Sequence, residues 1–216
     1  MKIIFFGSSD FSLPLLEACL QSGQELALVV TTPDQKKGRG LKVQPNPVKL
    51  FCEEKQIAFS APETLKTLES LEPVKARQPH LFVVASYGKI IPNAWLDVPS
   101  VLKINVHPSL LPKYRGAAPL NWPILDGEKE TGLSLAEITA KLDAGDIFFQ
   151  QKISLEDSMD SEYLSSELSK LGAAALRGLL KEIAAGRGSM SAADFVRGRR
   201  LGPGFNFLPA GTEKGK

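Results

Sequence analysis

Asn105 and His107 stand two residues apart in the stretch INVHPSLLP at 104–112, which follows an apolar run and leads into a proline-bounded loop. In a strand, side chains alternate between the two faces, so residues two apart share a face. An amide N–H beside a protonated imidazole can donate two hydrogen bonds to an oxyanion on an acyl carbon. The pair therefore predicts the chemistry of acyl transfer.

A second segment, KLDAGD at 141–146, supplies two carboxylates, Asp143 and Asp146, in a glycine-containing loop. A lone histidine at a strand end is typical of a structural role, and the chain has only one other, His80. The nearby carboxylates favour a catalytic histidine, since acid–base work needs a group that orients the imidazole or exchanges protons with it. Of the two carboxylates, Asp146 is the better candidate for bracing the loop.

The elements that must position these residues alternate between apolar runs and helical patterns. Strands are expected at 3–6, 26–31, 81–85 and 101–106, with helices at about 10–22 and 47–56. This order predicts βαβ units in an α/β fold with a mostly parallel central sheet. The segments 131–138 and 147–153 alternate in polarity and are expected to form an antiparallel pair, and leucines at helical spacing over 161–185 predict a long closing helix.

Composition limits the classes of protein that fit. The 216 residues are 43% hydrophobic and 23% charged, which is enough to bury a full core. The net charge of +2 does not by itself indicate nucleic-acid binding. Two cysteines, Cys19 and Cys52, predict reduced thiols, and no metal site is expected. With no stretch of membrane-spanning length, the chain is expected to be a cytoplasmic monomer.

The first strand ends in the turn Gly7-Ser8-Ser9-Asp10, which has one glycine where a dinucleotide-binding fingerprint has three. We interpret the turn as a plain strand-to-helix connection in which Ser9 or Asp10 caps the helix. A nicotinamide-dependent dehydrogenase is excluded on this ground.

The two segments together, NVHPSLLP at 105–112 and LDAGD at 142–146, resemble the signature of the folate-dependent formyltransferases. This resemblance implies a Rossmann-like formyltransferase fold with helices on both faces of the sheet, and Asn105, His107 and Asp143 as the catalytic set. It also implies 10-formyltetrahydrofolate as the formyl donor. In that family the catalytic asparagine and histidine would stabilise the oxyanion, and the aspartate would help move protons from the attacking amine to the leaving nitrogen.

The resemblance further implies two segments that contact the folate. One is Tyr87-Gly88-Lys89-Ile90-Ile91, after a central strand, where open α/β sheets bind ligands. Apolar residues such as Ile90 and Ile91 are equally consistent with a place in the core. The other segment is Ser109-Leu110-Leu111-Pro112, which follows the catalytic pair directly.

The loop at 32–42 distinguishes branches of the family. Its cations stand among glycines, as in KKGRGLK at 36–42, a composition that is also typical of a solvated loop. The loop resembles the inserted segment of the branch that acts on initiator methionyl-tRNA, which implies that Arg39 and Lys42 bind the substrate. The stretch YRGAAP at 114–119 resembles the same branch and adds Arg115 as a substrate contact, although this arginine is equally consistent with a cation that flanks a helix.

The domain organisation expected from the resemblance is a formyltransferase catalytic domain at 1–185 and a short basic tail at 186–216. Members of the tRNA branch normally carry a β-barrel domain after the catalytic domain, and the tail resembles only the end of those longer chains. Alternatives therefore stay open: a formyltransferase for a nucleotide-linked amino sugar, glycinamide ribonucleotide or another small amine, a hydrolase that releases formate, or a folate-binding paralogue of low activity.

Overall fold

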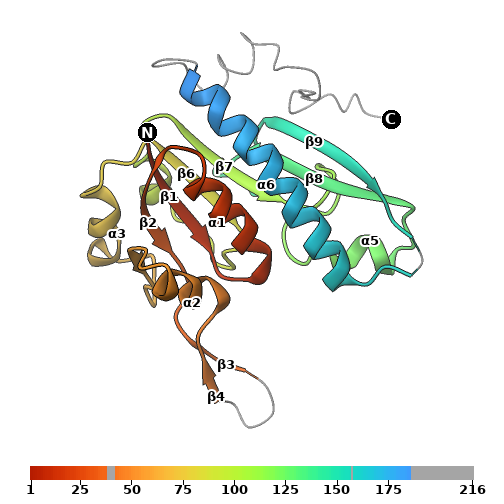
Figure 1. Cartoon of the computed structure of the whole chain (residues 1–216), viewed down its shortest axis with the longest axis horizontal. Coiled ribbons are helices and arrows are strands. Elements are labelled where there is room, and N and C mark those ends of the chain that lie inside the picture. Colours follow the sequence, from red (N-terminus) through yellow and green to blue (C-terminus); the bar gives the residue numbers. More distant parts are fainter. Residues whose placement is uncertain (38–41, 157, 186–216) are drawn as a thin grey trace. The chain divides into compact units, whose positions relative to one another are not determined.

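The computed structural model describes residues 1–37, 42–156 and 158–185 (Figure 1). The expected tail at 186–216 lies outside the described residues. The chain forms two compact units, the first comprising residues 1–103 and the second beginning at Ile104. Among the described helices, none is long and apolar enough to cross a membrane.

The first unit is built on a parallel sheet with the strand order β5-β2-β1-β6. Its strands are β1 (Lys2–Gly7), β2 (Glu25–Val30), β5 (Phe59–Ser60) and β6 (Leu81–Ala85). The registers pair Phe5 with Val29 on one side and with Val83 on the other. The structure confirms the strands predicted from apolar runs. The prediction works because a strand covered on both faces is apolar along its whole length. The two-residue β5 was not predicted.

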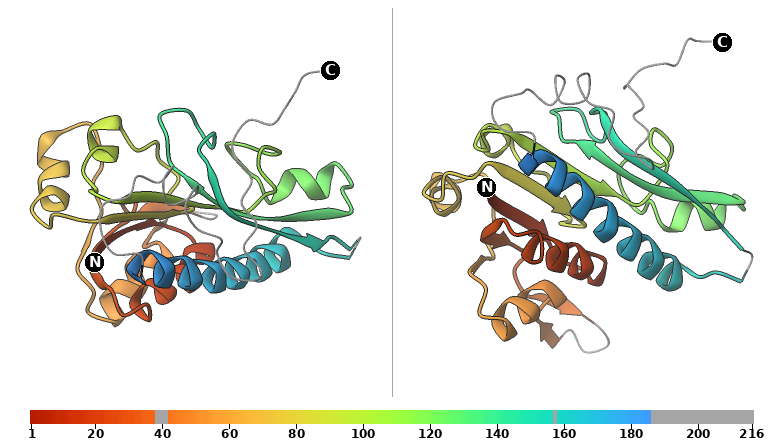
Figure 2. Two further views of the ribbon diagram at one scale, coloured as in Figure 1. Left: turned by 90° about the horizontal axis from the view of Figure 1, so that it is seen from above. Right: turned by 45° about the horizontal axis from the view of Figure 1, so that its top comes forward.

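Helices flank this sheet on both faces, as the left view of Figure 2 shows. They are α1 (Leu13–Leu20), α2 (Pro47–Glu54), α3 (Leu68–Lys75) and α4 (Asn93–Leu96). Helix α1 packs against β1, β2 and α2. On the other face, Ile4 and Phe6 of β1 form one core cluster with Leu71 of α3 and Trp95 of α4. The alternation of β1 side chains thus provides a separate core for each face.

The first helix differs from the expected continuous helix at about 10–22. A 3-10 turn, η1 (Asp10–Ser12), precedes α1, and Ser9 is its extended N-cap residue. Pro14 stands in the first turn of α1. Proline has no N–H to donate to a carbonyl four residues earlier, which disfavours a continuous α-helix from Asp10 through position 14 and favours a new helix start with Pro14 in its first turn.

The second unit contains an antiparallel sheet with the order β7-β8-β9. Its elements are β7 (Leu102–His107), α5 (Asn121–Leu125), β8 (Glu130–Glu137), β9 (Ile147–Ser154) and α6 (Ser161–Ala185). The predicted antiparallel pair is confirmed by the register of β8 and β9, which pairs Leu133 with Gln151. The predicted closing helix is confirmed as α6, which packs on β8. In Figure 1, α6 is the long blue helix and β8 and β9 are the green and cyan strands.

The polar segment at 32–42 was expected to be a loop, but part of it forms a β-hairpin. Strands β3 (Gln35–Lys37) and β4 (Lys42–Gln44) pair antiparallel and form a separate two-stranded sheet. Asn46 anchors the base of this hairpin, because its Nδ2 donates to the carbonyl of Thr32 over 2.7 Å and its Oδ1 accepts from the Thr31 hydroxyl over 2.9 Å. Residues 38–41 between the strands lie outside the described part of the chain.

Both cysteines are expected to resist thiol reagents while the protein is folded. Cys19 and Cys52 are free and fully buried. Burial raises the pKa of both thiols, that of Cys52 to about 11, so about one Cys52 thiol in a thousand would be ionised at pH 8. Reaction with Ellman's reagent should therefore be slow in the native state, faster as the pH rises toward the Cys52 pKa, and complete in guanidinium chloride. Rapid labelling of two thiols in the native protein would contradict this arrangement.

Candidate active site

Strand β7 places Asn105 and His107 on one face, as the spacing predicted. In the register with β8, Asn105 lies opposite Ala136 and His107 opposite Ser134. The intervening Val106 is buried, in keeping with the alternation of a strand that is packed on both faces. The strand ends at His107, so the imidazole stands at the C-terminal end of β7, where the loop at 108–120 begins.

Asp143 lies in the loop between β8 and β9 and brings the three predicted catalytic residues together. Its Oδ1 accepts a hydrogen bond from Asn105 Nδ2 over 2.9 Å. Its Oδ2 lies 3.7 Å from Nδ1 of His107 and accepts a hydrogen bond from the backbone N–H of Gly116 over 2.9 Å. The side chains of His107 and Asp143 are 6% and 8% exposed, so this interaction is little screened by water.

The loop that carries Asp143 is held by a close backbone approach at Gly145. A Cβ atom at this position would overlap the carbonyl of Glu137 in β8. The Asp146 carbonyl accepts a hydrogen bond from the N–H of Glu137 over 2.8 Å. Asp143 itself has a left-handed backbone with φ 46°, a conformation that aspartate tolerates better than most residues. The backbone of residues 145–146 therefore fixes where the Asp143 carboxylate points.

The contacts of the His107 ring define which nitrogen carries the proton in the neutral form. Nε2 lies 3.0 Å from the backbone carbonyl oxygen of Tyr114. A carbonyl oxygen only accepts hydrogen bonds, so the neutral ring is the tautomer that carries its proton on Nε2. Nδ1 therefore faces the Asp143 carboxylate.

This arrangement has the parts of a site that stabilises a developing oxyanion. Asn105 uses one amide N–H for Asp143 and has a second N–H to donate. His107, protonated at Nδ1, would form an ion pair with Asp143 and supply positive charge at the same edge of the sheet. Such donors are fixed before reaction, so they stabilise charge in the transition state without reorganising.

A buried network fixes the loop at 109–112, the second segment predicted to contact folate. Ser134 of β8 donates through its hydroxyl to the Ser109 carbonyl over 2.7 Å and accepts from the Leu111 N–H over 3.1 Å. Gln150 of β9 donates through Nε2 to the Leu111 carbonyl over 2.9 Å. The Leu111 side chain packs in a core cluster with Ala136 and Ile147. Ser109 and Leu111 therefore hold the loop, while Pro112 is exposed.

Replacing Ser134 by alanine is expected to loosen this loop. The Leu111 N–H and the Ser109 carbonyl would each lose a buried partner, which costs about 1–3 kcal/mol of unfolding free energy. Urea denaturation measures this loss, and titration with a tetrahydrofolate measures the accompanying fall in affinity. Ser166→Ala, an exposed position on α6, is the matched control and should change stability by no more than about 0.5 kcal/mol. Equal effects of the two substitutions would contradict the role of the network.

The other predicted folate segment, Tyr87–Ile91, belongs to the first unit. The Tyr87 side chain is 2% exposed in the core against Phe6, and burial raises its pKa to about 12. Lys89 Nζ donates to the carbonyl of Pro62 over 2.9 Å. Ile91 packs against the core, whereas Ile90 is 88% exposed and is available to a ligand. The role of this segment in folate binding stays a prediction.

The predicted substrate-binding cations fall in different parts of the chain. Arg39 lies outside the described residues. Lys42 opens strand β4 of the hairpin, opposite Lys37. Arg115 is exposed and follows Tyr114, whose carbonyl contacts His107. Their contact with a substrate stays a prediction.

Two kinds of residue at the site escaped the sequence reasoning. Tyr114 and Gly116 act through backbone atoms, which every residue type has, and only the glycine at 116, with φ 84°, left a trace in the sequence. Ser134 and Gln150 act through side chains on β8 and β9, and the polar Ser134 between Leu133 and Leu135 was a signal that could have found the first of them.

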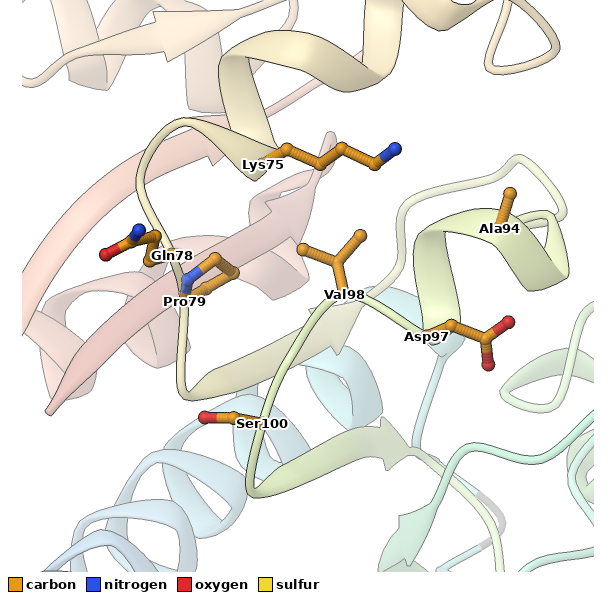
Figure 3. Close-up of a pocket in the computed structure, with 7 residues that line it drawn as sticks. All are labelled: Lys75, Gln78, Pro79, Ala94, Asp97, Val98 and Ser100. Carbon is orange, nitrogen blue, oxygen red and sulfur yellow. The ribbon is translucent and has the colours of Figure 1, made fainter.

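A cavity of about 460 Å³ lies in the first unit, between the end of α3 and α4 (Figure 3). Lys75, Gln78, Asp97 and Ser100 line it, with Pro79, Ala94 and Val98. It opens beside the start of β6, whereas Tyr87–Ile91 follow the end of that strand. The cavity contains none of the predicted site residues. Within the described residues no cluster of three histidine, cysteine, aspartate or glutamate side chains is arranged to hold a metal ion.

Comparison with known proteins identifies the family to which this chain belongs. The sequence profile of the family described as formyl transferase matches residues 1–179, and the chain belongs to this family. Among curated relatives, it is 42% identical over 188 residues to the methionyl-tRNA formyltransferase of Caldanaerobacter subterraneus subsp. tengcongensis, a match that covers 87% of this chain. It is 44% identical over 183 residues, 85% of its length, to that of Acetivibrio thermocellus.

These matches cover 61% and 59% of the two relatives, so the chain spans about three fifths of their length. Among solved structures, the phosphoribosylglycinamide formyltransferase of Bacillus halodurans matches with a TM-score of 0.68 and 23% identity, over 85% of this chain and 97% of that one. This likeness shows the fold. The predicted formyltransferase fold class is thereby confirmed, together with the family.

Proposed function

We propose that this chain transfers a formyl group from 10-formyltetrahydrofolate to the amino group of initiator methionyl-tRNA. The observation that carries the proposal is the carboxylate of Asp143, which binds Asn105 and Gly116 and faces His107 in one buried cluster. The proposed acceptor is that of the relatives, since the two curated relatives, from Caldanaerobacter subterraneus and Acetivibrio thermocellus, are methionyl-tRNA formyltransferases at more than 40% identity.

The proposed residue roles follow from the geometry of the cluster. The folate supplies an activated formyl group, the amine nitrogen bonds to its carbon, and the bond from that carbon to the folate nitrogen breaks. The second amide N–H of Asn105 and the protonated His107 stabilise the negative charge on the formyl oxygen. The proton lost by the amine reaches the leaving nitrogen with Asp143 as the relay. The reaction thus balances with no added oxidant, reductant or metal.

We assign the folate to the loop at 109–112 and to Tyr87–Ile91, and the tRNA to Arg39, Lys42 and Arg115. Support for the first assignment is the network of Ser134 and Gln150, which rigidifies the loop next to His107. Support for the second is the exposure of Arg115 one residue after Tyr114. Translation initiation places the reaction in the cytoplasm, and we expect a monomer, which light scattering of the purified chain would check.

The test is a formylation assay with the purified chain, 10-formyltetrahydrofolate and initiator methionyl-tRNA, in which formyl-methionyl-tRNA is measured after chromatography. Binding of tetrahydrofolate is measured separately by calorimetry, so that loss of donor binding and loss of acceptor binding are distinguished. Formyl-methionyl-tRNA formed at a rate that depends on enzyme concentration supports the proposal.

Parallel assays with a nucleotide-linked amino sugar, with glycinamide ribonucleotide and with water as the acceptor cover the alternatives. Formylation of a small amine without formylation of the tRNA would overturn the acceptor. Release of formate alone would indicate a hydrolase, and folate binding without turnover on any acceptor would indicate a binding protein. Because the relatives are longer than this chain, the tRNA concentration is varied to separate weak binding from slow chemistry.

A further inference from the structure

The segment at 113–116 contacts both catalytic side chains through its backbone. The Tyr114 carbonyl oxygen lies 3.0 Å from Nε2 of His107, and the Gly116 N–H donates to Oδ2 of Asp143 over 2.9 Å. Two residues of one short loop therefore hold the imidazole and the carboxylate at once. Any change in the backbone of this loop would alter the geometry between His107 and Asp143.

Tyr114 has a backbone conformation that is uncommon for an aromatic residue. Its φ is 57°, in the left-handed region, which an aromatic residue seldom adopts unless its surroundings impose it. The adjoining chain constrains the segment from one side, since Lys113 donates its N–H to the Leu110 carbonyl over 3.0 Å and its own carbonyl accepts from the Ser109 hydroxyl over 2.7 Å. The constraint on the other side comes from the Tyr114 side chain.

The phenol of Tyr114 is placed between two carboxylates. Its oxygen lies 2.9 Å from Oδ2 of Asp126 and 3.0 Å from Oε1 of Glu128. The same Glu128 oxygen accepts from Nζ of Lys113 over 2.8 Å. Asp126 is the C-cap residue of helix α5, and Glu128 donates its N–H to the Pro123 carbonyl over 3.0 Å, so both carboxylates belong to the turn that leads into β8.

The surroundings of the Tyr114 phenol favour its protonated form. Partial desolvation and the two neighbouring carboxylates raise the pKa of Tyr114, because an ionised phenol would lose its bond to them and be repelled. Lys113 and the Tyr114 hydroxyl lower the pKa of Glu128, which stays an ionised acceptor. The phenol has one hydrogen, which the two carboxylates share, and a hydrogen bond to an ionised acceptor is stronger than one between neutral groups.

We propose that Tyr114 is a positioning residue for His107. Its phenol, held by Asp126 and Glu128, fixes the backbone that aims the Tyr114 carbonyl at Nε2, which keeps the proton on Nε2 and directs Nδ1 toward Asp143. This inference rests on the proposed function only in giving His107 a catalytic role. Tyr114 acts on the reaction through His107, and its side chain has no part in the bond changes.

The test uses Tyr114→Phe, which removes the hydroxyl and keeps the ring and the carbonyl. The chain has only two histidines, so ring ¹⁵N NMR resolves His107 from His80, and a His80→Gln sample assigns the signals. In the wild type, neutral His107 is expected as the tautomer protonated on Nε2. In Tyr114→Phe the two ring ¹⁵N shifts should move toward each other, because the tautomer protonated on Nδ1 becomes populated.

Turnover gives the second readout. We expect Tyr114→Phe to lower kcat by about tenfold, with KM for the folate changed less than about twofold, since an imidazole that is misplaced slows chemistry more than binding. Tyr163→Phe on α6 is the matched control, because it removes a hydroxyl from a half-exposed tyrosine of the same unit. Replacing both Asp126 and Glu128 by alanine should reproduce the spectrum of Tyr114→Phe.

The outcomes separate this inference from the proposed function. If the His107 spectrum of Tyr114→Phe matches the wild type, the inference is overturned, even where the melting temperature falls. If the spectrum changes as expected but the wild type formylates no acceptor, the positioning of His107 is supported and the proposed function fails. If the wild type is active and Tyr114→Phe keeps its full kcat, only the inference about Tyr114 fails.

Discussion

Asp143→Asn is expected to lower kcat/KM for formyl transfer by about a thousandfold while the protein stays folded. The carboxylate accepts from Asn105 Nδ2 and from the Gly116 N–H, each over 2.9 Å. An amide at this position has one oxygen, so it can satisfy one of these donors while its NH₂ group faces the other. It also carries no charge to pair with a protonated His107.

The loss is therefore expected in three places at once: the orientation of Asn105, the placement of the loop at 113–116 and the charge beside Nδ1 of His107. Steady-state kinetics on the formyl acceptor measures it, with circular dichroism as the check on folding. Asp160→Asn is the matched control, because Asp160 accepts from the N–H of Tyr163 at the start of α6 and asparagine caps a helix equally well. A variant Asp143→Asn within tenfold of the wild type would remove Asp143 from the mechanism.

His107→Ala carries the second large effect, a fall in kcat of about 10²–10⁴-fold. Alanine removes the imidazole that faces Asp143, so this buried carboxylate loses the group that can carry a positive charge beside it. The fold should persist, because His107 ends β7 and its backbone keeps its place opposite Ser134. Single-turnover measurement of formyl transfer separates this loss from any change in product release.

His80→Gln is the control for His107→Ala, since the His80 side chain lies in the first unit and accepts from the Lys2 N–H through Nδ1 over 3.0 Å. Its turnover should stay within about twofold of the wild type. The double variant of His107→Ala and Asp143→Asn gives a sharper test. If the two residues act as one unit, it should be no slower than the slower single variant. A loss equal to the product of the two single losses would show that they act independently.

The first unit shows where a linear pattern suffices for the fold. The runs at 3–6, 26–31 and 81–85 correspond to β1, β2 and β6, because strands buried on both faces need apolar residues throughout. The hairpin of β3 and β4 was missed, since three-residue strands with a polar sequence give no periodic signal. The base of this segment is ordered by Asn46, whose side chain bonds to Thr31 and Thr32, which stand 15 and 14 residues earlier in the sequence.

The candidate site divides in the same way. The sequence determined that Asn105 and His107 share a face, because a strand has a period of two whatever surrounds it. It also supplied Asp143 in a glycine-containing loop, where a left-handed aspartate and the close approach of Gly145 are possible. These are local properties, and they follow from residue type and spacing alone.

Only the tertiary structure decided that Asp143 meets Asn105 across 38 residues of sequence. That contact depends on the loop between β8 and β9, which is set by the antiparallel register and not by any residue's own preference. Likewise, the state of the His107 ring depends on the backbone carbonyl of Tyr114. A carbonyl is common to all residues, so a sequence lists candidate side chains, whereas the folded chain selects the backbone atoms that orient them.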